Sequence, residues 1–460
     1  MPGAFDGINM ATTALWASQQ ELDVTGDNVA NVNTPGYSEQ AVTVSEAPTS
    51  TYYSDGAQQQ QGSGVTVDSV NRVRSALLDA QMNSAQSTLG TYTSLSGNLQ
   101  QVASVLNDTN GTGIGNDIDQ FFNAWSALGS NPNSAGATTA VQQAGLNLTQ
   151  DVQSAASQLN QLSGQANGQV QSTISQVNTL AKQIAGLNSQ IVQAQATGES
   201  PNSLLDQRTQ ALSDLANLVN IQTNTNSDGS VSVNVSQFDL VDQGGAKGFP
   251  TTYNAANGTV GSAGATISVT GGQLSGLFQS INAIQGDQTQ LDTIANTLTT
   301  QVNGLSTTGK TSTGTTGVNF FDPSSTGAAT FQLSSTVAAN ASSIAAGTSG
   351  NSGDGSLALK ISNLQSSTTL PGLGGQTISG YYQGLIGQVG SSASTYQNSL
   401  STQQAVITQI TGQISTTSGV DLDTQMADML KYQQSYSVAA RALSIFQQTT
   451  EDLLTAISGA

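Results

Sequence analysis

The chain has 460 residues, which is enough for two to four domains and a sizeable buried core. Only 8% of its residues are charged, against roughly 25% in an average soluble protein. The 28 acidic residues outnumber the 9 basic ones and give a net charge of −19. Only Arg72 and Arg74 come near to forming a basic cluster, so we expect neither nucleic acid nor an anionic membrane surface as a partner.

Cysteine and histidine are both absent from the sequence. Disulfides, thiolate chemistry, Ser–His–Asp triads and the usual zinc ligand sets are therefore excluded. A hydrolase with a pair of carboxylates remains open as the enzyme alternative, but no pair stands out among the 28 acidic residues. We expect no catalytic residue, no cofactor and no metal site.

No segment approaches the ~20 consecutive apolar residues that cross a bilayer. Residues 1–10 lack the basic and apolar regions of a cleavable secretory signal. Taken alone, this suggests a cytoplasmic protein. The lack of cysteine and a composition that secreted adhesins share indicate instead export by a route without cleavage.

Both ends of the chain have the spacing of amphipathic helices. In steps of four and three from Leu422 to Ile457, eight of eleven positions are apolar. The N-terminal pattern is weaker and runs from Phe5 to Leu22. These helices could pack on the body of the same molecule, or pair with each other and with neighbouring subunits; the pattern alone leaves both open.

Longer helices are predicted between these ends. Apolar residues keep the same spacing over residues 92–106, 152–194 and 277–305, and long helices of this kind usually form bundles. Asp117 is expected to cap a short helix whose aromatic residues, among them Phe121 and Trp125, belong to the core.

Strand patterns begin after Leu218. Val231, Val233 and Val235 alternate with polar residues directly after Asp228-Gly229, a favoured hairpin turn. Residues 266–270 predict another strand. Residues 307–371 are rich in Ser, Thr and Gly and predict a β-rich or loop-rich lobe, or in part a flexible insertion.

The predicted fold class is α+β, mostly α. It combines paired terminal helices in coiled-coil-like packing, an elongated helical bundle domain and a smaller β-rich lobe. The expected domains are a terminal helical inner domain (1–45 with 416–460), a helical bundle (46–220 with 271–306 and 372–415), a β-hairpin subdomain (221–270) and a β- or loop-rich outer lobe (307–371).

Residues 28–37, N-V-A-N-V-N-T-P-G-Y, resemble the N-terminal signature of flagellar rod, hook and hook-associated proteins. Pro35-Gly36 favours a turn, and Pro35 biases Thr34 toward an extended conformation, so the signature should end the first helix and redirect the chain. We expect five residues to set this bend: Asn31, Asn33, Pro35, Gly36 and Tyr37.

Further segments support this resemblance. Residues 418–423, 426–427, 432–436 and 439–441 are similar to the terminal helix of the same family. Residues 204–208 (L-L-D-Q-R), 271–277 (G-G-Q-L-S-G-L) and 121–132 resemble the hook-associated protein 1 family in particular. Two positions depart from the family pattern, Glu39 and Thr139, where a basic residue and an arginine are expected.

The resemblance implies a structural protein without catalysis, a junction between hook and filament, exported through the flagellar type III channel to the cell exterior. Its terminal helices would pair in the inner layer of the axial structure and become ordered on assembly, because a short apolar face does not offset roughly 1–2 kcal/mol of backbone ordering per residue. The expected assembly residues, for which ordinary core packing is the alternative, are Leu15, Leu22, Val29, Met426, Met429, Tyr436, Leu443 and Leu454.

The implied partners are other copies of the chain, the hook protein, hook-associated protein 3 and an export chaperone that binds the C-terminal region. Two other readings remain. Hook-associated protein 3 or a hook or rod protein would share part of the signatures, whereas a secreted adhesin would fit the composition but needs a signal or anchor.

Overall fold

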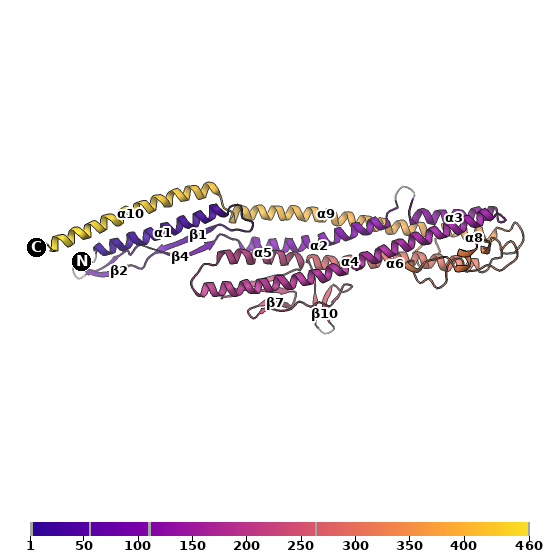
Figure 1. The fold of residues 1–460 in the computed structure, drawn as a ribbon, viewed down its shortest axis with the longest axis horizontal. Helices are drawn as coiled ribbons and strands as arrows, with labels where there is room; N and C mark the ends of the chain where they lie inside the picture. The colour runs from indigo at the N-terminus through magenta and orange to yellow at the C-terminus, as the bar shows by residue number, and fades with distance from the viewer. Residues whose placement is uncertain (1–2, 55–56, 109–111, 263–264, 459–460) are drawn as a thin grey trace. The chain divides into compact units, whose positions relative to one another are not determined.

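The computed structural model describes residues 3–54, 57–108, 112–262 and 265–458. Its elements are drawn in Figure 1. The chain forms two compact units. We call residues 1–86, 177–249 and 404–460 the terminal unit, and residues 87–176 and 250–403 the central unit.

In the terminal unit, helices α1 (Gly3–Asn31) and α10 (Leu422–Ser458) lie along each other (Figure 1). Small buried residues of α1, Gly7, Ala11 and Ser18, follow one another at steps of four and seven. A Cβ at Gly7 would lie 2.7 Å from the ring of Phe446, so the two helices can approach closely only because glycine is there. The predicted pairing of the terminal helices is confirmed.

Four strands of the terminal unit follow α1. Strand β1 (Gln40–Glu46) pairs antiparallel with β4 (Val65–Arg72), with an irregularity after Thr43, and β2 (Ser50–Ser54) pairs with β3 (Ala57–Gln61). The expectation that strands begin only after Leu218 is therefore wrong. Residues of β1 and β4 are half-buried or exposed, so their alternation between apolar and polar residues is weak.

The predicted valine strand lies in a four-stranded antiparallel sheet of the terminal unit. Its order is β5 (Gln222–Thr225), β6 (Val231–Val235), β7 (Phe238–Asp242) and β8 (Gly245–Ala246). Val231, Val233 and Val235 are buried, and the turn before β6 contains Gly229 in the left-handed region. Helix α5 (Asn202–Leu218) and residues 177–196 of α4 complete this unit.

The central unit is a helical bundle. It contains α3 (Ile114–Ser130), α6 (Gly272–Ser306) and parts of α2 (Ala76–Leu106), α4 (Ala135–Ala196) and α9 (Ile378–Ser418). The apolar positions predicted from spacing in α2, α4 and α6 include fully buried residues such as Leu106, Val170 and Leu291. A three-stranded sheet has the order β11 (Ala265–Ser268), β10 (Thr259–Ser262) and β9 (Tyr253–Asn254).

Aromatic rings fill one part of this core. Phe121 and Trp125 of α3 pack against Phe320 with ring centroids 5.5 and 5.3 Å apart, and the ring of Phe321 lies tilted against that of Phe331 at 4.6 Å. These rings are almost completely buried. The aromatic residues of the predicted short helix are therefore core, as expected.

Residues 307–371 take the loop-rich alternative. Their described structure consists of isolated bridges and short helices. These are η1 (Ala328–Thr330), α7 (Ser335–Ala339), η2 (Ala341–Ser343), α8 (Ser356–Ser362) and η3 (Asn363–Ser366). Helix α8 packs on α3 and buries Leu357 and Ile361, so this segment contributes to the same core.

Asp117 does not cap α3, contrary to the prediction. The helix begins at Ile114 after Gly113, so Asp117 already lies inside it, whereas a cap must precede the first turn. The carboxylate near this helix start is that of Asp108, which accepts a hydrogen bond from the Gly115 N–H at 3.0 Å. Asp117 is instead buried; burial, followed by the nearby carboxyl of Asp151, raises the pKa of Asp117 to about 7.

Candidate assembly site

The signature residues form a tight bend after α1. The helix ends at Asn31, whose carbonyl accepts the Thr34 N–H at 2.8 Å, and the Thr34 carbonyl accepts the Tyr37 N–H at 3.2 Å. Gly36 has φ of 82°, which favours glycine. Asn33, Pro35 and Gly36 are exposed, whereas Asn31 and Tyr37 are half-buried. The bend thus leads the chain from α1 into β1.

Asn28 connects three elements at this bend. Its side chain is only 2% exposed. Its Oδ1 accepts the Tyr37 hydroxyl at 2.9 Å and the Gln40 N–H at 3.0 Å, while its Nδ2 donates to the Gln40 carbonyl and to Gln425 Oε1, both at 2.9 Å. The last bond reaches α10 across 397 residues of sequence. One amide therefore fixes α1, β1 and the start of α10 together.

Glu39 extends this connection to the start of α10. Its carboxylate accepts a hydrogen bond from Gln425 Nε2 at 2.9 Å, and its backbone N–H donates to the Ser418 carbonyl at 2.8 Å. Burial raises the pKa of Glu39, and burial likewise raises the pKa of Tyr37. At the position where the sequence departs from the family pattern, the residue therefore has a structural partner on the other terminal helix.

Asp206 fastens the other side of the bend. It accepts hydrogen bonds from the Ser38 hydroxyl at 2.8 Å and from Arg72 Nη1 at 2.7 Å. Arg74 donates to Ser38 Oγ at 2.9 Å and forms an ion pair with Asp79 at 2.8 Å. The two clustered arginines thus form internal ion pairs.

Arg208, two residues after Asp206, fastens the valine hairpin. Its guanidinium is buried and donates to Asn188 Oδ1 at 3.0 Å and to the Gly229 carbonyl at 2.7 Å. Burial, assisted by the charge of Arg72, lowers the pKa of Arg208 to about 10, so it remains a cation at neutral pH. The Asn188 side chain also donates to the carbonyl of Val231 and accepts from the N–H of Val231. The L-L-D-Q-R segment therefore joins the bend to the hairpin.

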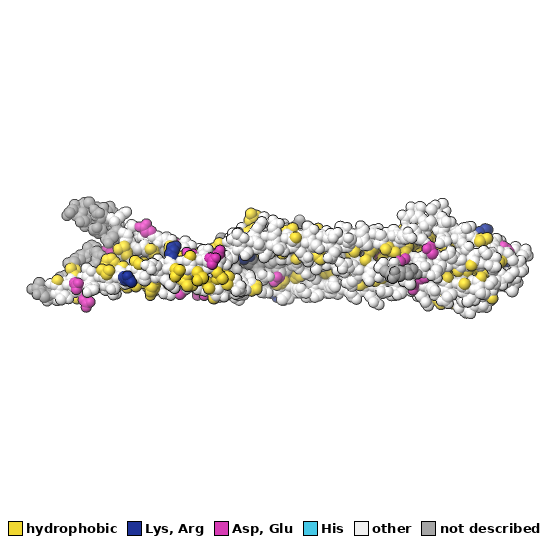
Figure 2. All heavy atoms as spheres, turned by 90° about the horizontal axis from the view of Figure 1, so that it is seen from above, with side chains coloured by type: hydrophobic (Ala, Val, Ile, Leu, Met, Phe, Trp, Pro, Cys, Tyr) yellow, Lys and Arg dark blue, Asp and Glu magenta, His cyan; other side chains and the backbone are white. Residues whose placement is uncertain are grey.

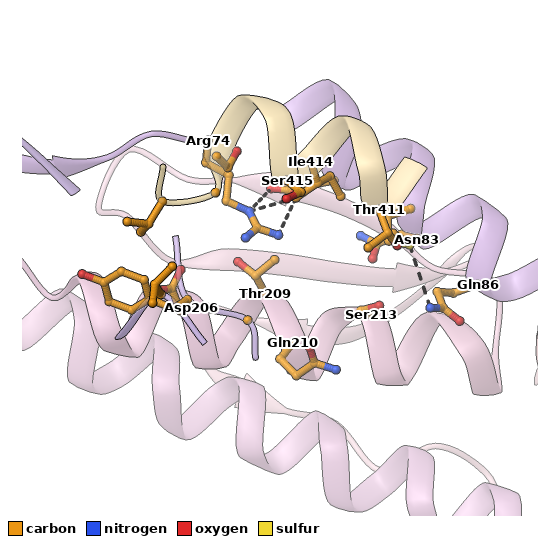
Figure 3. A pocket seen from close by; sticks show the side chains of 18 residues that line it. Arg74, Asn83, Gln86, Asp206, Thr209, Gln210, Ser213, Thr411, Ile414 and Ser415 are labelled. Atoms are coloured by element: carbon orange, nitrogen blue, oxygen red, sulfur yellow. Dashed lines mark hydrogen bonds and ion pairs between the residues drawn. The ribbon is translucent and has the colours of Figure 1, made fainter. Parts of the chain in front are cut away.

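A cavity of about 390 Å³ lies beside the bend in the terminal unit. Figure 3 shows Thr411, Ile414 and Ser415 of α9 on one side of it and Asp206, Thr209, Gln210 and Ser213 of α5 on the other. Its wall is mainly hydroxyls and amides, and its charged side chains take part in the ion pairs described above. Nothing in this wall resembles a nucleophile with an adjacent base.

In the part of the chain that the structure describes, no group of three Asp or Glu side chains is arranged to hold a metal ion. In the same residues, no helix is both long enough and apolar enough to cross a membrane.

The predicted assembly residues lie on the two paired helices, where some are half-buried and others are exposed. Five are half-buried: Leu15, Leu22, Val29, Met429 and Leu443. Three are exposed: Met426, Tyr436 and Leu454. Small and polar residues are also buried on these helices but were not among the predicted assembly residues, which were mostly large apolar side chains. They include Ala11, Ser18, Gln425 and Ala439.

Apolar side chains are unusually exposed on these helices. Trp16 is 76% exposed and Met426 is 61% exposed, and the same holds for Phe5, Leu430, Val438, Ile445 and Leu453 to different degrees. Figure 2 shows apolar side chains gathered over the terminal helices. Extended apolar patches on a soluble protein mark surfaces that meet a partner.

Three family models match successive parts of the chain. Residues 8–37 match the flagella basal body rod protein, residues 99–321 match the flagellar hook-associated protein FlgK helical domain, and residues 412–456 match the flagellar basal body rod FlgEFG protein C-terminal region. Flagellar hook-associated protein 1 of Bacillus subtilis is 26% identical over 99% of this chain and 98% of its own length. The chain is thus similar to flagellar hook-associated protein 1 along almost its whole length.

Other relatives match shorter regions. Flagellar hook-associated protein 1 of Escherichia coli is 27% identical over 49% of this chain and 41% of its own length. The protein of the same name from Salmonella typhimurium is 27% identical over 52% of this chain and 42% of its own length. The solved structure of the flagellar hook junction protein FlgK from Burkholderia pseudomallei shares the fold, with a TM-score of 0.64 and 19% identity over 73% of this chain and 99% of that one. The matching family models and relatives are all flagellar structural proteins, which supports a structural role without catalysis for this chain.

Proposed function

We propose that this chain forms the junction between the flagellar hook and the filament, and that its copies assemble through α1 and α10. The observation that carries the proposal is the exposed apolar face of the paired terminal helices, with Trp16 and Met426 largely open to solvent. Neighbouring subunits can bury this face, at about 25 cal/mol per Å² of apolar surface. The names of the relatives, hook-associated protein 1 and hook junction protein, support the same location.

Within this proposal the assembly residues have two tasks. Leu15, Leu22, Val29, Met429 and Leu443, which are half-buried, hold the helix pair together. Met426, Tyr436 and Leu454, which are exposed, meet neighbouring copies. Asn31, Asn33, Pro35, Gly36 and Tyr37 direct the chain away from this inner layer.

The finer parts of the assignment are also proposals. The hook protein would contact the assembly on one side and hook-associated protein 3 on the other. An export chaperone would bind the C-terminal region until the chain passes the type III channel to the cell exterior without cleavage. The four-domain division would describe the layers of the assembled structure, with residues 1–45 and 416–460 innermost.

The test uses hooks isolated from a strain that lacks all hook-associated proteins. The purified chain is added alone, and the hook ends are examined by electron microscopy. We expect new density at the distal end, and further growth only after hook-associated protein 3 is supplied. Bare ends would contradict the proposal, and direct assembly of the next layer on ends without this chain would favour the hook-associated protein 3 alternative.

Met426→Asp is the most informative variant in this experiment. Met426 is exposed, so the change should leave the isolated chain folded, but it would place an unpaired charge in the contact with a neighbour. We expect Met426→Asp to abolish addition to hooks and Met426→Leu, its apolar control, to retain it. Leu443→Asp should also abolish assembly and motility, but Leu443 is half-buried, so that variant can act by separating α1 from α10. Normal assembly by Met426→Asp would contradict the assignment of this face.

A further inference from the structure

A second cavity, of about 300 Å³, lies in the central unit between α2, α6 and α9. This volume is at the low end of the range for pockets that bind small molecules. Its apolar wall comes from Leu95 and Leu99 of α2, Ala283 of α6, and Val389 and Tyr396 of α9. Leu95 and Leu99 are almost fully buried.

Asp287 of α6 supplies a carboxylate to this wall. The residue is only 5% exposed, and within the described ranges no hydrogen bond or ion pair reaches its side chain. Burial raises the pKa of Asp287 to about 6, and no neighbouring charge contributes. The carboxylate is therefore mostly ionised at pH 7.5 although the residue is largely buried, and a cation in the cavity would stabilise it.

Two amides also line the cavity, and both already donate elsewhere. Gln279 uses its Nε2 to donate to Ser275 Oγ at 3.2 Å, and Asn282 uses its Nδ2 to donate to the Ala255 carbonyl at 2.9 Å. Asp287 is therefore the one carboxylate in a wall that is otherwise polar-neutral or apolar. A single carboxylate with an apolar floor matches a cationic group on an aliphatic stem.

The cavity is open beside Asp287. A Cβ built on Gly286 would meet no atom within 4 Å. A single carboxylate does not make a metal site, and no metal-holding cluster occurs in the described part of the chain. The occupant is therefore better sought among organic cations than among divalent metals.

We propose that this cavity binds a primary alkylammonium group, with the ammonium against Asp287 and its stem on Leu95, Leu99 and Tyr396. The ammonium can donate to the Asp287 carboxylate and to water, and the stem buries apolar surface. The group could come from a free amine or from a lysine of a neighbouring copy, and both offer the same chemistry. The proposal does not depend on the junction function.

The test titrates the full chain with n-pentylamine by isothermal titration calorimetry at pH 7.5. We expect saturable one-to-one binding. Asp287→Asn removes the charge, and Gly286→Leu fills the space while leaving Asp287 in place; each should weaken binding at least about tenfold, since the carboxylate and the space are both required. Gly304→Leu is the matched control on the same helix, since Gly304 is exposed and also has open space, and it should bind as the wild type does.

The acid form gives an independent readout. With the pKa of Asp287 at about 6, the ionised fraction at pH 5 is roughly one tenth, so binding should weaken about tenfold between pH 7.5 and pH 5. The phenol of Tyr396 is the other ionisable group among the lining residues. Unchanged affinity at pH 5 would contradict the role of Asp287.

Two results would overturn the proposal. One is no saturable binding of n-pentylamine up to ~10 mM, the weak end of specific affinities. The other is equal binding of n-pentanol, which would reduce the site to an apolar cavity. Repeating the titration on hook-bound protein identifies the source of the ammonium group. Loss of n-pentylamine binding would support a lysine of a neighbouring copy in the cavity, and retained binding would support a free amine.

Discussion

Replacing Asp117 by asparagine should change how the stability of the central unit depends on pH. Asp117 is 8% exposed in α3, its Oδ2 has no hydrogen-bond partner in the described structure, and the carboxyl of Asp151 on α4 lies nearby. Burial and this second carboxyl raise the pKa of Asp117 from 3.8 to about 7. The folded protein therefore binds this proton more tightly than the unfolded chain does.

This pKa shift determines the sign and the size of the change in the free energy of unfolding with pH. The stabilisation is fully present below the unfolded pKa of about 3.9 and is lost as the pH rises through about 7. Each pH unit in this window corresponds to about 1.4 kcal/mol, so between pH 5 and pH 8.5 the wild type should lose about 3 kcal/mol that Asp117→Asn does not lose. Contributions from groups that do not interact with Asp117, such as Asp287, cancel in this comparison, whereas Asp151 is part of the effect that is measured.

Urea unfolding followed by tryptophan fluorescence can measure the difference. The sequence contains two tryptophans, Trp16 in α1 and Trp125 in α3. A Trp16→Phe background leaves Trp125, which is buried beside Phe121 and reports on the central unit. Asp423→Asn on α10 is exposed and should match the wild type. Equal pH slopes for the wild type and Asp117→Asn would refute the argument that Asp117 keeps its proton near neutral pH.

The two other predictions concern the bend after α1. Asn28→Ala removes the amide that joins Tyr37, Gln40 and Gln425, and leaving these partners unsatisfied should cost about 3 kcal/mol in denaturant unfolding of the terminal unit. Asn224→Ala, at an exposed position of β5 in the same unit, is the nearly neutral control. Asp206→Ala leaves the partly buried Arg72 without its carboxylate and should cost about 2–3 kcal/mol. Asp214→Ala, on an exposed position of α5, should cost less than about 1 kcal/mol. Similar values for the two variants would show that the Arg72 ion pair does not hold the bend.

Helices and local turns were predictable from the sequence because their determinants are close together in the chain. The spacing of apolar residues in α4 and α6 coincides with buried positions, and the Asp228-Gly229 turn before β6 is present. The end of α1 at Asn31 and the bend that follows agree with the signature. In each case a few neighbouring residues determine the conformation.

Contacts between distant segments were not predictable. Asp206 meets Arg72 across 134 residues, and Asn28 meets Gln425 across 397, so no local pattern marks these polar pairs. The β1–β4 pair was missed because its stability comes from pairing and from packing beside α1, with few buried apolar residues of its own. The prediction for Asp117 was wrong because an acidic residue near the start of a helix can be either its cap or part of its first turn. The helix begins at Ile114, after Gly113 and with Asp108 bonded to Gly115, so Asp117 lies in the first turn.

The most direct test of the account measures whether the exposed face of α10 becomes buried on assembly. The natural sequence has no cysteine, so a single introduced thiol can be followed without background. Met426→Cys reports on the proposed contact, and Gln161→Cys reports on an exposed position of α4 in the central unit. The account predicts that thiol labelling at position 426 slows strongly when the chain adds to isolated hooks, while labelling at position 161 slows less. Equal labelling rates at position 426 in free and hook-bound protein would contradict assembly through this face.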